Sequence, residues 1–231
     1  MALDNKKIIA LLPMKGHSER VPLKNLRNFN GKPLYHAILN TLLSSDKIDE
    51  VIINTDCKNI VRDVEANFKS RVIVRIRPEA IRGDFVSMNK IIEDDLNHSG
   101  GTVYLQTHST NPLLKVSSIN KALDRMLVLK GKKDSIFSVT KIQTRFYDQE
   151  GKAINHNPEE LIRTQDLTPI FEENSCFYIF SKESFAQSNN QRIGVNPEMF
   201  ELDKIEANDI DTKEDFIITE AIYKQIRHEN S

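Results

Sequence analysis

The feature that most constrains the fold is an uninterrupted run of apolar residues, Ile8 to Leu12, near the start of the chain. A strand with one face in water alternates apolar and polar residues. An unbroken apolar run is instead typical of a strand buried on both faces, as in the middle of a parallel sheet. Pro13 and Gly16 then interrupt the run and predict a loop directly after the strand.

Apolar segments alternate with helical patterns along the rest of the chain. Strands are predicted at 50–54, 72–76, 102–105, 135–139 and 176–180, and helices at 34–43, 58–68, 87–98, 118–129 and 213–227. This alternation predicts an α/β fold with helices around a mainly parallel sheet. Residues 141–171 show neither period, and we interpret them as an excursion from the sheet.

Length, charge and cysteine content exclude several classes of protein. The 231 residues, 39% apolar and 28% charged, are expected to form one soluble domain over 1–231. Because 32 basic and 33 acidic side chains nearly cancel, no broad basic surface for nucleic acid is expected. Cys57 and Cys176 fit neither a disulfide framework nor a zinc site. With no signal core and no membrane-spanning stretch in the sequence, we expect a cytoplasmic protein without a membrane partner.

The loop after the first strand carries the chemistry most suited to phosphate. Lys15, Arg20 and Lys24 bring positive charge, and Gly16 lets the main chain approach a ligand. Ser18 and Asn25 add directional hydrogen bonds. A solvated basic loop is the alternative, and composition alone favours it. The position of the loop favours a ligand site, because ligands of open α/β sheets bind beyond the carboxyl ends of the strands.

Asp209 and Asp211 form a second candidate site near the end of the chain. Alternate residues of an extended segment point the same way, so the two carboxylates could share one Mg²⁺. Magnesium commonly takes one or two carboxylates plus substrate phosphates, so this pair and the opening loop could hold one metal triphosphate. The alternative is helix capping, by Asp211 or Thr212, and for this pair alone capping is the better explanation.

Two further loops follow predicted strands. Arg77, Arg82, Asp84 and Ser87 could grip a base or ribose, or Asp84 or Ser87 could simply cap the next helix. Gln106 begins a run of hydrogen-bonding side chains, which could contact a ligand or form an ordinary polar turn before Pro112. The chain has no Walker loop, no dinucleotide G-x-G-x-x-G, no nucleophile elbow and no H-E-x-x-H pattern.

Taken in order, five segments resemble the acylneuraminate cytidylyltransferases, or CMP-sialate synthetases. They are PMKGHSERVPLKN, GKPL, RPEAIRGDFVS, LQTHSTNPL and DIDT. The resemblance spans nearly the whole chain, and Lys24-Asn25 favours this branch over the related 3-deoxy-octulosonate enzymes.

The resemblance implies a nucleotidyltransferase that moves CMP from CTP to the anomeric hydroxyl of a nonulosonic acid and releases pyrophosphate. It implies a three-layer domain, a Mg²⁺ cofactor and a homodimer joined by an arm at 141–171. It also implies roles for three groups of residues. Lys15, Lys24 and Asp211 would be catalytic, Asp209 with Asp211 would bind the metal, and Gln106 and Asn174 would bind the sugar. The nucleotide would be bound by Lys15, Gly16, Ser18, Arg20, Lys24, Asn25, Arg77, Asp84 and Ser87.

The chain departs from the family pattern at three places. Lys15 stands where an arginine is common, and loses the planar fork that binds phosphate bidentately. Leu114, followed by Lys115, takes the place of an arginine, and Arg163 comes one position early. Two rival functions stay open. One is a glycosyltransferase with an Asp-x-Asp metal site, although its acidic pair usually lies mid-domain, and the other is a nucleotide-binding module without catalysis.

Overall fold

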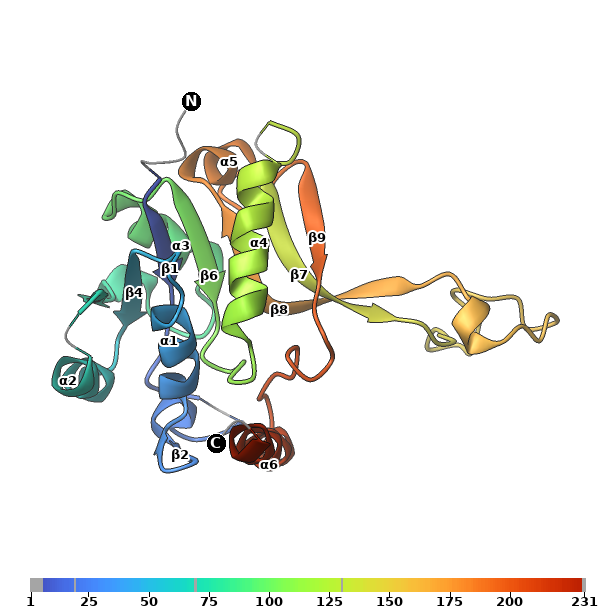
Figure 1. Ribbon diagram of the computed structural model, residues 1–231, viewed down its shortest axis with the longest axis horizontal. Coiled ribbons are helices and arrows are strands. Elements are labelled where there is room, and N and C mark those ends of the chain that lie inside the picture. The colour runs from blue at the N-terminus through green and yellow to red at the C-terminus, as the bar shows by residue number, and fades with distance from the viewer. Residues whose placement is uncertain (1–5, 19, 69, 130, 230–231) are drawn as a thin grey trace.

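The computed structural model describes residues 6–18, 20–68, 70–129 and 131–229 (Figure 1). The first five residues, which the sequence places before the first strand, lie outside the described part. The main sheet has seven strands in the order β5-β4-β1-β6-β8-β7-β9. Their bounds are β1 (Ile8–Leu11), β4 (Glu50–Thr55), β5 (Val72–Ile76), β6 (Val103–Thr107), β7 (Ser135–Ile142), β8 (Ile170–Phe180) and β9 (Pro197–Glu201).

The sheet is mainly parallel, as the alternating pattern predicts. Strands β5, β4, β1 and β6 pair in parallel, and β7 pairs in parallel with β9. Only β8 runs antiparallel to its neighbours β6 and β7. The carboxyl ends of β1, β4, β5 and β6 therefore meet at one edge of the sheet, where a ligand site is expected.

Helices cover both faces and give three layers. Apolar side chains of α1 (Tyr35–Leu43), α2 (Lys58–Asn67) and α4 (Val116–Val128) join one core cluster, and those of α3 (Met88–Asn97) and α5 (Lys182–Gln187) join another. The first strand divides its side chains between them. Ile8 and Ala10 lie in the first cluster and Ile9 and Leu11 in the second. The prediction of a strand buried on both faces is confirmed.

The last helix, α6 (Lys213–Glu229), packs outside these layers (Figure 1). Its Phe216 joins a third apolar cluster with Leu34 at the start of α1 and with Phe29. Phe29 belongs to a small hairpin of β2 (Asn28–Phe29) and β3 (Lys32–Pro33). Ile210 is buried in the same cluster, so the segment that precedes α6 is anchored beside the opening loop.

Residues 141–171 project from the sheet as a ribbon, drawn in yellow and orange in Figure 1, which is two-stranded where it leaves the body and continues into turns and a short 3-10 helix at Thr164–Asp166. The excursion predicted from the sequence is present, but its ends are regular structure. Strand β7 continues to Ile142 and β8 already begins at Ile170, with Ile142 paired to Ile170. The sequence missed these pairs because the strand segments in the ribbon lack a buried face and hence an apolar alternation.

Several short elements were also missed. The hairpin β2–β3, helix α5 and strand β9 each have six residues or fewer, too few to show a period. Helix α5 does carry a local signal, because Ser181 and Ser184 form a reciprocal capping box. None of the helices in the described ranges is both long and apolar enough to span a membrane.

Candidate functional site

A cleft of about 390 Å³ lies at the carboxyl ends of the parallel strands. Three segments that are far apart in the sequence form its walls. They are the loop after β1, the loop before α3 and the turn after β6, represented by Lys15, Ser18, Arg20, Lys24, Asn25, Arg77, Asp84, His108, Ser109 and Thr110. The first and second segments contain most of the residues predicted to bind a nucleotide.

The loop after β1 is held in shape by hydrogen bonds with the side chains of Asp56 and Asn25. The amide of Gly16 donates to Asp56 Oδ1 at 2.8 Å. A Cβ atom at Gly16 would lie 2.8 Å from the Cβ of Cys57, so this position has no room for a side chain. Asn25 donates to the carbonyl of Lys15 at 2.8 Å and accepts from Ser109 Oγ at 2.6 Å. Asn25 therefore ties the loop to the turn after β6.

Lys24 brings the opening loop against the end of the chain. Its ammonium donates to the carbonyl of Ile210 at 2.6 Å and lies 3.7 Å from Asp211 Oδ1. Burial lowers the pKa of Lys24, and the charges of Asp211 and Asp209 oppose that shift. Leu23, just before it, has a left-handed φ of 54°, a conformation that is costly for a bulky side chain.

Asp209 and Asp211 both lie at this contact. Asp211 pairs with Arg20 at 2.8 Å as well as with Lys24. Burial is the main cause that raises the pKa of Asp209, whose Oδ1 lies 3.3 Å from the amide nitrogen of Asn111. Among the described residues, no group of three or more His, Cys, Asp or Glu side chains is arranged for a metal. Any metal here would have this carboxylate pair and ligands from a substrate.

Capping of the last helix does not explain Asp211. Thr212 Oγ1 accepts from the amide of Asp215 at 3.1 Å, and Asp215 Oδ2 accepts from the amide of Thr212 at 2.7 Å. Thr212 and Asp215 thus satisfy the helix terminus between them. The alternative that Asp211 supplies the cap is wrong, and its carboxylate faces the cations instead.

Arg77 is buried beneath the cleft and holds the ends of two strands together. Its guanidinium donates to Met14 O at 3.0 Å, to Asn54 O at 2.9 Å and to Asn54 Oδ1 at 2.9 Å. Burial lowers the pKa of Arg77. Asn54 in turn donates to Asp95 Oδ1 at 2.8 Å, and Asp95 Oδ2 is buried without a hydrogen-bond partner. Arg77 thus shapes the cleft from below by fixing the main chain before Lys15.

The loop before α3 contributes unequally to the cleft. Asp84 pairs with Lys15 at 2.5 Å, and this contact lowers the pKa of Asp84. Ser87 is exposed and accepts from the amide of Asn89, so it is the N-cap of α3, one of the two alternatives for this residue. Arg82 donates to the carbonyl of Arg77 at 2.8 Å.

Gln106 lies at the end of β6 in a polar cluster that sequence reasoning only partly found. Its Oε1 accepts from Arg192 Nη1 at 2.8 Å, and its Nε2 lies 3.3 Å from His108 Nε2. Burial and the charge of Arg192 lower the pKa of His108 to about 4, so the ring is neutral at neutral pH. His108 and Arg192 were not predicted, because no sequence motif links β6 to the loop before β9.

Asn174 lies beside a second hollow of about 600 Å³, which Asp209 and Asp211 also line. Its side chain accepts from Ser138 Oγ at 2.6 Å and donates to Thr140 Oγ1 at 3.0 Å. These bonds bridge the irregular register between β7 and β8. The structure therefore gives Asn174 a structural task at the edge of this hollow, and sugar binding stays a prediction.

The departures from the family pattern have local partners. Leu114 is buried in the core cluster that α4 also joins. Lys115 pairs with Glu206 at 3.2 Å, and Arg163 pairs with Asp166 at 2.7 Å within the ribbon. None of these three side chains lines the cleft.

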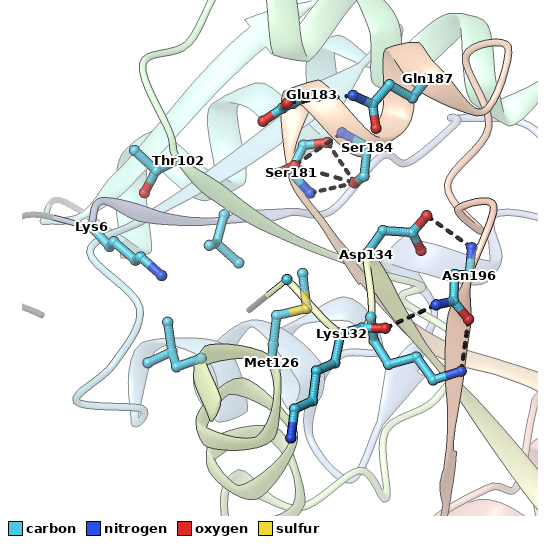
Figure 2. A pocket seen from close by; sticks show the side chains of 14 residues that line it. Lys6, Thr102, Met126, Lys132, Asp134, Ser181, Glu183, Ser184, Gln187 and Asn196 are labelled. Atoms are coloured by element: carbon cyan, nitrogen blue, oxygen red, sulfur yellow. Dashed lines mark hydrogen bonds between the residues drawn. The ribbon is translucent and has the colours of Figure 1, made fainter. Parts of the chain in front are cut away.

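A larger cavity, of about 650 Å³, lies at the opposite, amino edge of the sheet (Figure 2). Its polar side chains bond mainly to one another. Asn196 donates to Lys132 O at 2.9 Å and its main-chain amide to Asp134 Oδ2 at 2.9 Å, while Ser181 and Ser184 form their capping box. Neither the basic loop nor the acidic pair lies near this edge.

Comparison with known proteins gives consistent matches along the chain. Pseudaminic acid cytidylyltransferase of Campylobacter jejuni subsp. jejuni serotype O:2 is 25% identical over 97% of this chain and 99% of its own length. CMP-N,N'-diacetyllegionaminic acid synthase of Legionella pneumophila is 26% identical over 94% of this chain and 96% of its own length. N-acylneuraminate cytidylyltransferase A of Danio rerio is 27% identical over 94% of this chain, which spans 50% of that relative.

Solved structures share the fold. CMP:2-keto-3-deoxy-manno-octonic acid synthetase, solved in complex with CTP, aligns with 95% of this chain and 99% of its own at a TM-score of 0.70 and 15% identity. A 4-diphosphocytidyl-2C-methyl-D-erythritol synthase from Anaerococcus prevotii aligns with 95% of this chain and 96% of its own at a TM-score of 0.68 and 14% identity. These two likenesses support the α/β fold.

The model of one protein family extends over almost the entire chain. This model, described as cytidylyltransferase, matches residues 9–228. The match includes all three segments of the cleft and the acidic pair. The resemblance that five sequence segments indicated is therefore confirmed. The chain belongs to the cytidylyltransferase family.

Proposed function

We propose that this cytidylyltransferase transfers CMP from CTP to the anomeric hydroxyl of a nonulosonic acid and releases pyrophosphate. The observation that carries the proposal is the contact of Lys24 with Asp211 at 3.7 Å beside the cleft. It joins the basic loop to the acidic pair, the arrangement that a metal triphosphate needs. The names of three relatives, which specify pseudaminic, legionaminic and N-acylneuraminic acid, support a nonulosonic acid as acceptor.

The nucleotide is proposed to lie along the cleft with its phosphates at the opening loop. Lys15 and Lys24 supply charge for the phosphates, as does Arg20, and Ser18 supplies a directional donor. In the structure, Lys15 is paired with Asp84 and Arg20 with Asp211. A triphosphate would compete with these carboxylates for the same cations.

Asp209 and Asp211 are proposed to hold Mg²⁺. Both offer hard oxygen ligands, and two carboxylates plus substrate phosphates suit this ion. A divalent cation would also offset the burial that raises the pKa of Asp209. When bound, the ion would neutralise charge on the phosphates and on the leaving pyrophosphate.

The proposed reaction is an in-line displacement at the α-phosphorus. The sugar hydroxyl oxygen forms the new P–O bond, the bond to the bridging oxygen of pyrophosphate breaks, and the hydroxyl loses its proton, with a carboxylate of the acidic pair as acceptor. The protein itself needs to make and break few covalent bonds in this reaction. Its contribution would come from positioning and from the fixed charges of Lys15 and Lys24.

The ribbon at 141–171 is proposed to join two copies of the chain. On this segment the side chains of Leu161 and Ile154 are 93% and 62% exposed, so neither is covered by the body of the protein. Such apolar exposure on a projecting element favours a protein partner. We expect a dimer by light scattering, and Leu161→Glu together with Ile154→Glu should yield monomers with an unchanged circular dichroism spectrum.

Pyrophosphate release tests the proposed reaction directly. Purified protein would be incubated with Mg²⁺, each of the four nucleoside triphosphates and a panel of pseudaminic, legionaminic and N-acetylneuraminic acids. We expect release only with CTP and with at least one of these acids. Binding of CTP without release under every condition would favour the non-catalytic module.

The glycosyltransferase alternative is disfavoured by the position of the acidic pair. Asp209 and Asp211 follow the last strand of the sheet and lead into α6, whereas that enzyme class usually carries such a pair mid-domain. Transfer of sugar from a nucleotide sugar, in an assay free of CTP, would support the glycosyltransferase alternative.

A further inference from the structure

Arg192 is a cation whose nearest partners are neutral side chains. It belongs to the connection between α5 and β9. Its guanidinium carbon lies 3.7 Å from the centroid of the Tyr178 ring, and its Nη2 donates to the Tyr178 hydroxyl at 3.0 Å. Its Nη1 donates to Gln106 Oε1 at 2.8 Å and lies 3.3 Å from His108 Nε2. Only 21% of the side chain is exposed.

The charge of Arg192 is poorly compensated. Burial lowers the pKa of Arg192, which means that its charged form has lost solvation. Gln106 and Tyr178 are neutral, and the pKa of His108, lowered to about 4, keeps that ring neutral as well. Within the described part of the chain, the carboxylate that pairs with Arg192 is that of Glu173, which is 4.0 Å away and already accepts a hydrogen bond from the Tyr178 hydroxyl. Buried charges usually have a closer partner, so an anion is favoured here.

The sheet places this cation next to the cleft. Gln106 on β6 is paired with Tyr178 on β8, and Tyr104 and Tyr178 pack in the cluster on the α3 side. His108, two residues beyond Gln106, lines the nucleotide cleft itself. Arg192 Nη1 lies 3.3 Å from the ring of His108, so the guanidinium contacts a side chain of the cleft wall. Its Nε and one proton of Nη2 are not used by the contacts described above.

We propose that Arg192 determines acceptor specificity by binding the carboxylate of the acidic sugar. This inference rests on the proposed function, because it names the group on the acceptor that the site recognises. Arginine suits the task because a planar guanidinium can bind a carboxylate through two parallel hydrogen bonds. Gln106 is fully buried and accepts from Arg192 through Oε1, so it fixes the orientation of the guanidinium.

The test compares an acid with its neutral isostere. N-acetylneuraminic and pseudaminic acids, and the C1 carboxamide of each, would be titrated by calorimetry into the wild type, Arg192→Met and Arg192→Lys, all with CTP and Ca²⁺ in place of Mg²⁺ to slow turnover. Pyrophosphate release would be measured in parallel with Mg²⁺. Arg125→Met is the matched control, because Arg125 lies on α4 and pairs with Glu198 far from the cleft.

We expect Arg192→Met to weaken binding of the preferred acid by about 30- to 100-fold while binding of its carboxamide changes less than threefold, as loss of a charged pair predicts. The affinity of Arg192→Lys for the preferred acid should lie between those of the wild type and Arg192→Met. The affinity for CTP and the thermal midpoint should stay near the wild-type values. Wild-type discrimination between acid and carboxamide should disappear in Arg192→Met.

Three results would overturn the inference. One is an equal loss for acid and carboxamide, which indicates that Arg192 only positions Gln106. Another is a loss of CTP affinity in place of acid affinity, which indicates a phosphate contact. The third is wild-type binding that does not distinguish acid from carboxamide. Failure of the proposed function has a different signature, since acid-selective binding that depends on Arg192 would persist without pyrophosphate release.

Discussion

A cavity at the amino edge of the sheet and a cleft at its carboxyl edge differ in their side chains, and the smaller of the two, the cleft, carries the groups suited to a nucleotide. The cavity at the amino edge, of about 650 Å³, is lined by side chains that bond largely to one another. The cleft at the carboxyl edge, of about 390 Å³, is lined by lysines and an arginine from the loop after β1, and Arg20 and Lys24 pair with Asp211 in the neighbouring hollow. The carboxyl edge is distinguished by charged side chains whose present ion pairs a ligand can replace. The size of the cavity does not distinguish it.

The difference follows from strand direction. Parallel strands send their following loops to one edge, so functional side chains from distant segments converge there. At the amino edge, Lys133 donates to Asn196 at 2.8 Å and to Pro197 O at 3.1 Å, which closes the surface between β7 and β9. Substitutions at the carboxyl edge should therefore alter turnover, and comparable substitutions at the amino edge should not.

The largest expected effect comes from the lysine that joins the loop to the acidic pair. Lys24→Met should lower kcat/KM by about 100-fold or more, because a preorganised charge beside the phosphates is lost. Lys132→Met removes a lysine from the amino edge and should change the rate by less than about twofold. Initial rates of pyrophosphate release would compare them. Equal rates in both variants would contradict the claim that only the carboxyl edge takes part in turnover.

Asp211→Asn is expected to follow closely. This variant keeps the size of the side chain but removes one metal-binding charge, so the Mg²⁺ concentration for half-maximal rate should rise and kcat should fall by about 30- to 100-fold. Asp124→Asn, which breaks only an exposed pair with Lys47, is the control. An unchanged magnesium dependence in Asp211→Asn would show that Asp211 does not bind the ion.

Asp95 tests the polar support beneath the cleft. Burial raises the pKa of Asp95 from 3.8 to about 6, so ionisation weakens the folded state as the pH rises from about 4 to 6. Asp95→Asn keeps an acceptor for Asn54 and cannot ionise. The variant should match the wild type below pH 4 and exceed its free energy of unfolding by about 3 kcal/mol at pH 7.

Urea unfolding of both proteins across this pH range would measure the effect. A constant difference between them at every pH would show that Asp95 does not titrate in this window.

The smallest effect is expected from a single methyl group. Gly16→Ala places a Cβ 2.8 Å from the Cβ of Cys57, so the loop must shift and KM for CTP should rise by about tenfold. Gly100→Ala adds the same methyl group at the amino edge, where nothing lies within 4 Å, and should leave KM unchanged. An unchanged KM in Gly16→Ala would indicate that the loop tolerates displacement.

The order of the elements could be predicted where apolar periodicity was long enough. The strand at Ile8 to Leu11 and the helices α1, α2, α3, α4 and α6 are in this group. Strand β9 and helix α5 were not predicted, since five and six residues carry little periodicity. Likewise, the sequence left the capping alternatives for Ser87 and Asp211 open, and favoured capping for the acidic pair taken alone; only the actual partners of the two helix ends decided between them.

What the sequence determined by itself was the set of groups: a buried first strand, a basic loop that must follow it, and two carboxylates on one extended segment near the end of the chain. The tertiary structure decided which of these groups meet. Lys24 reaches Ile210 across 186 residues, and Arg192 reaches Gln106 across 86. Local patterns carry no information on such contacts, because they arise from strand order and from the packing of Ile210 and Tyr178 in separate apolar clusters.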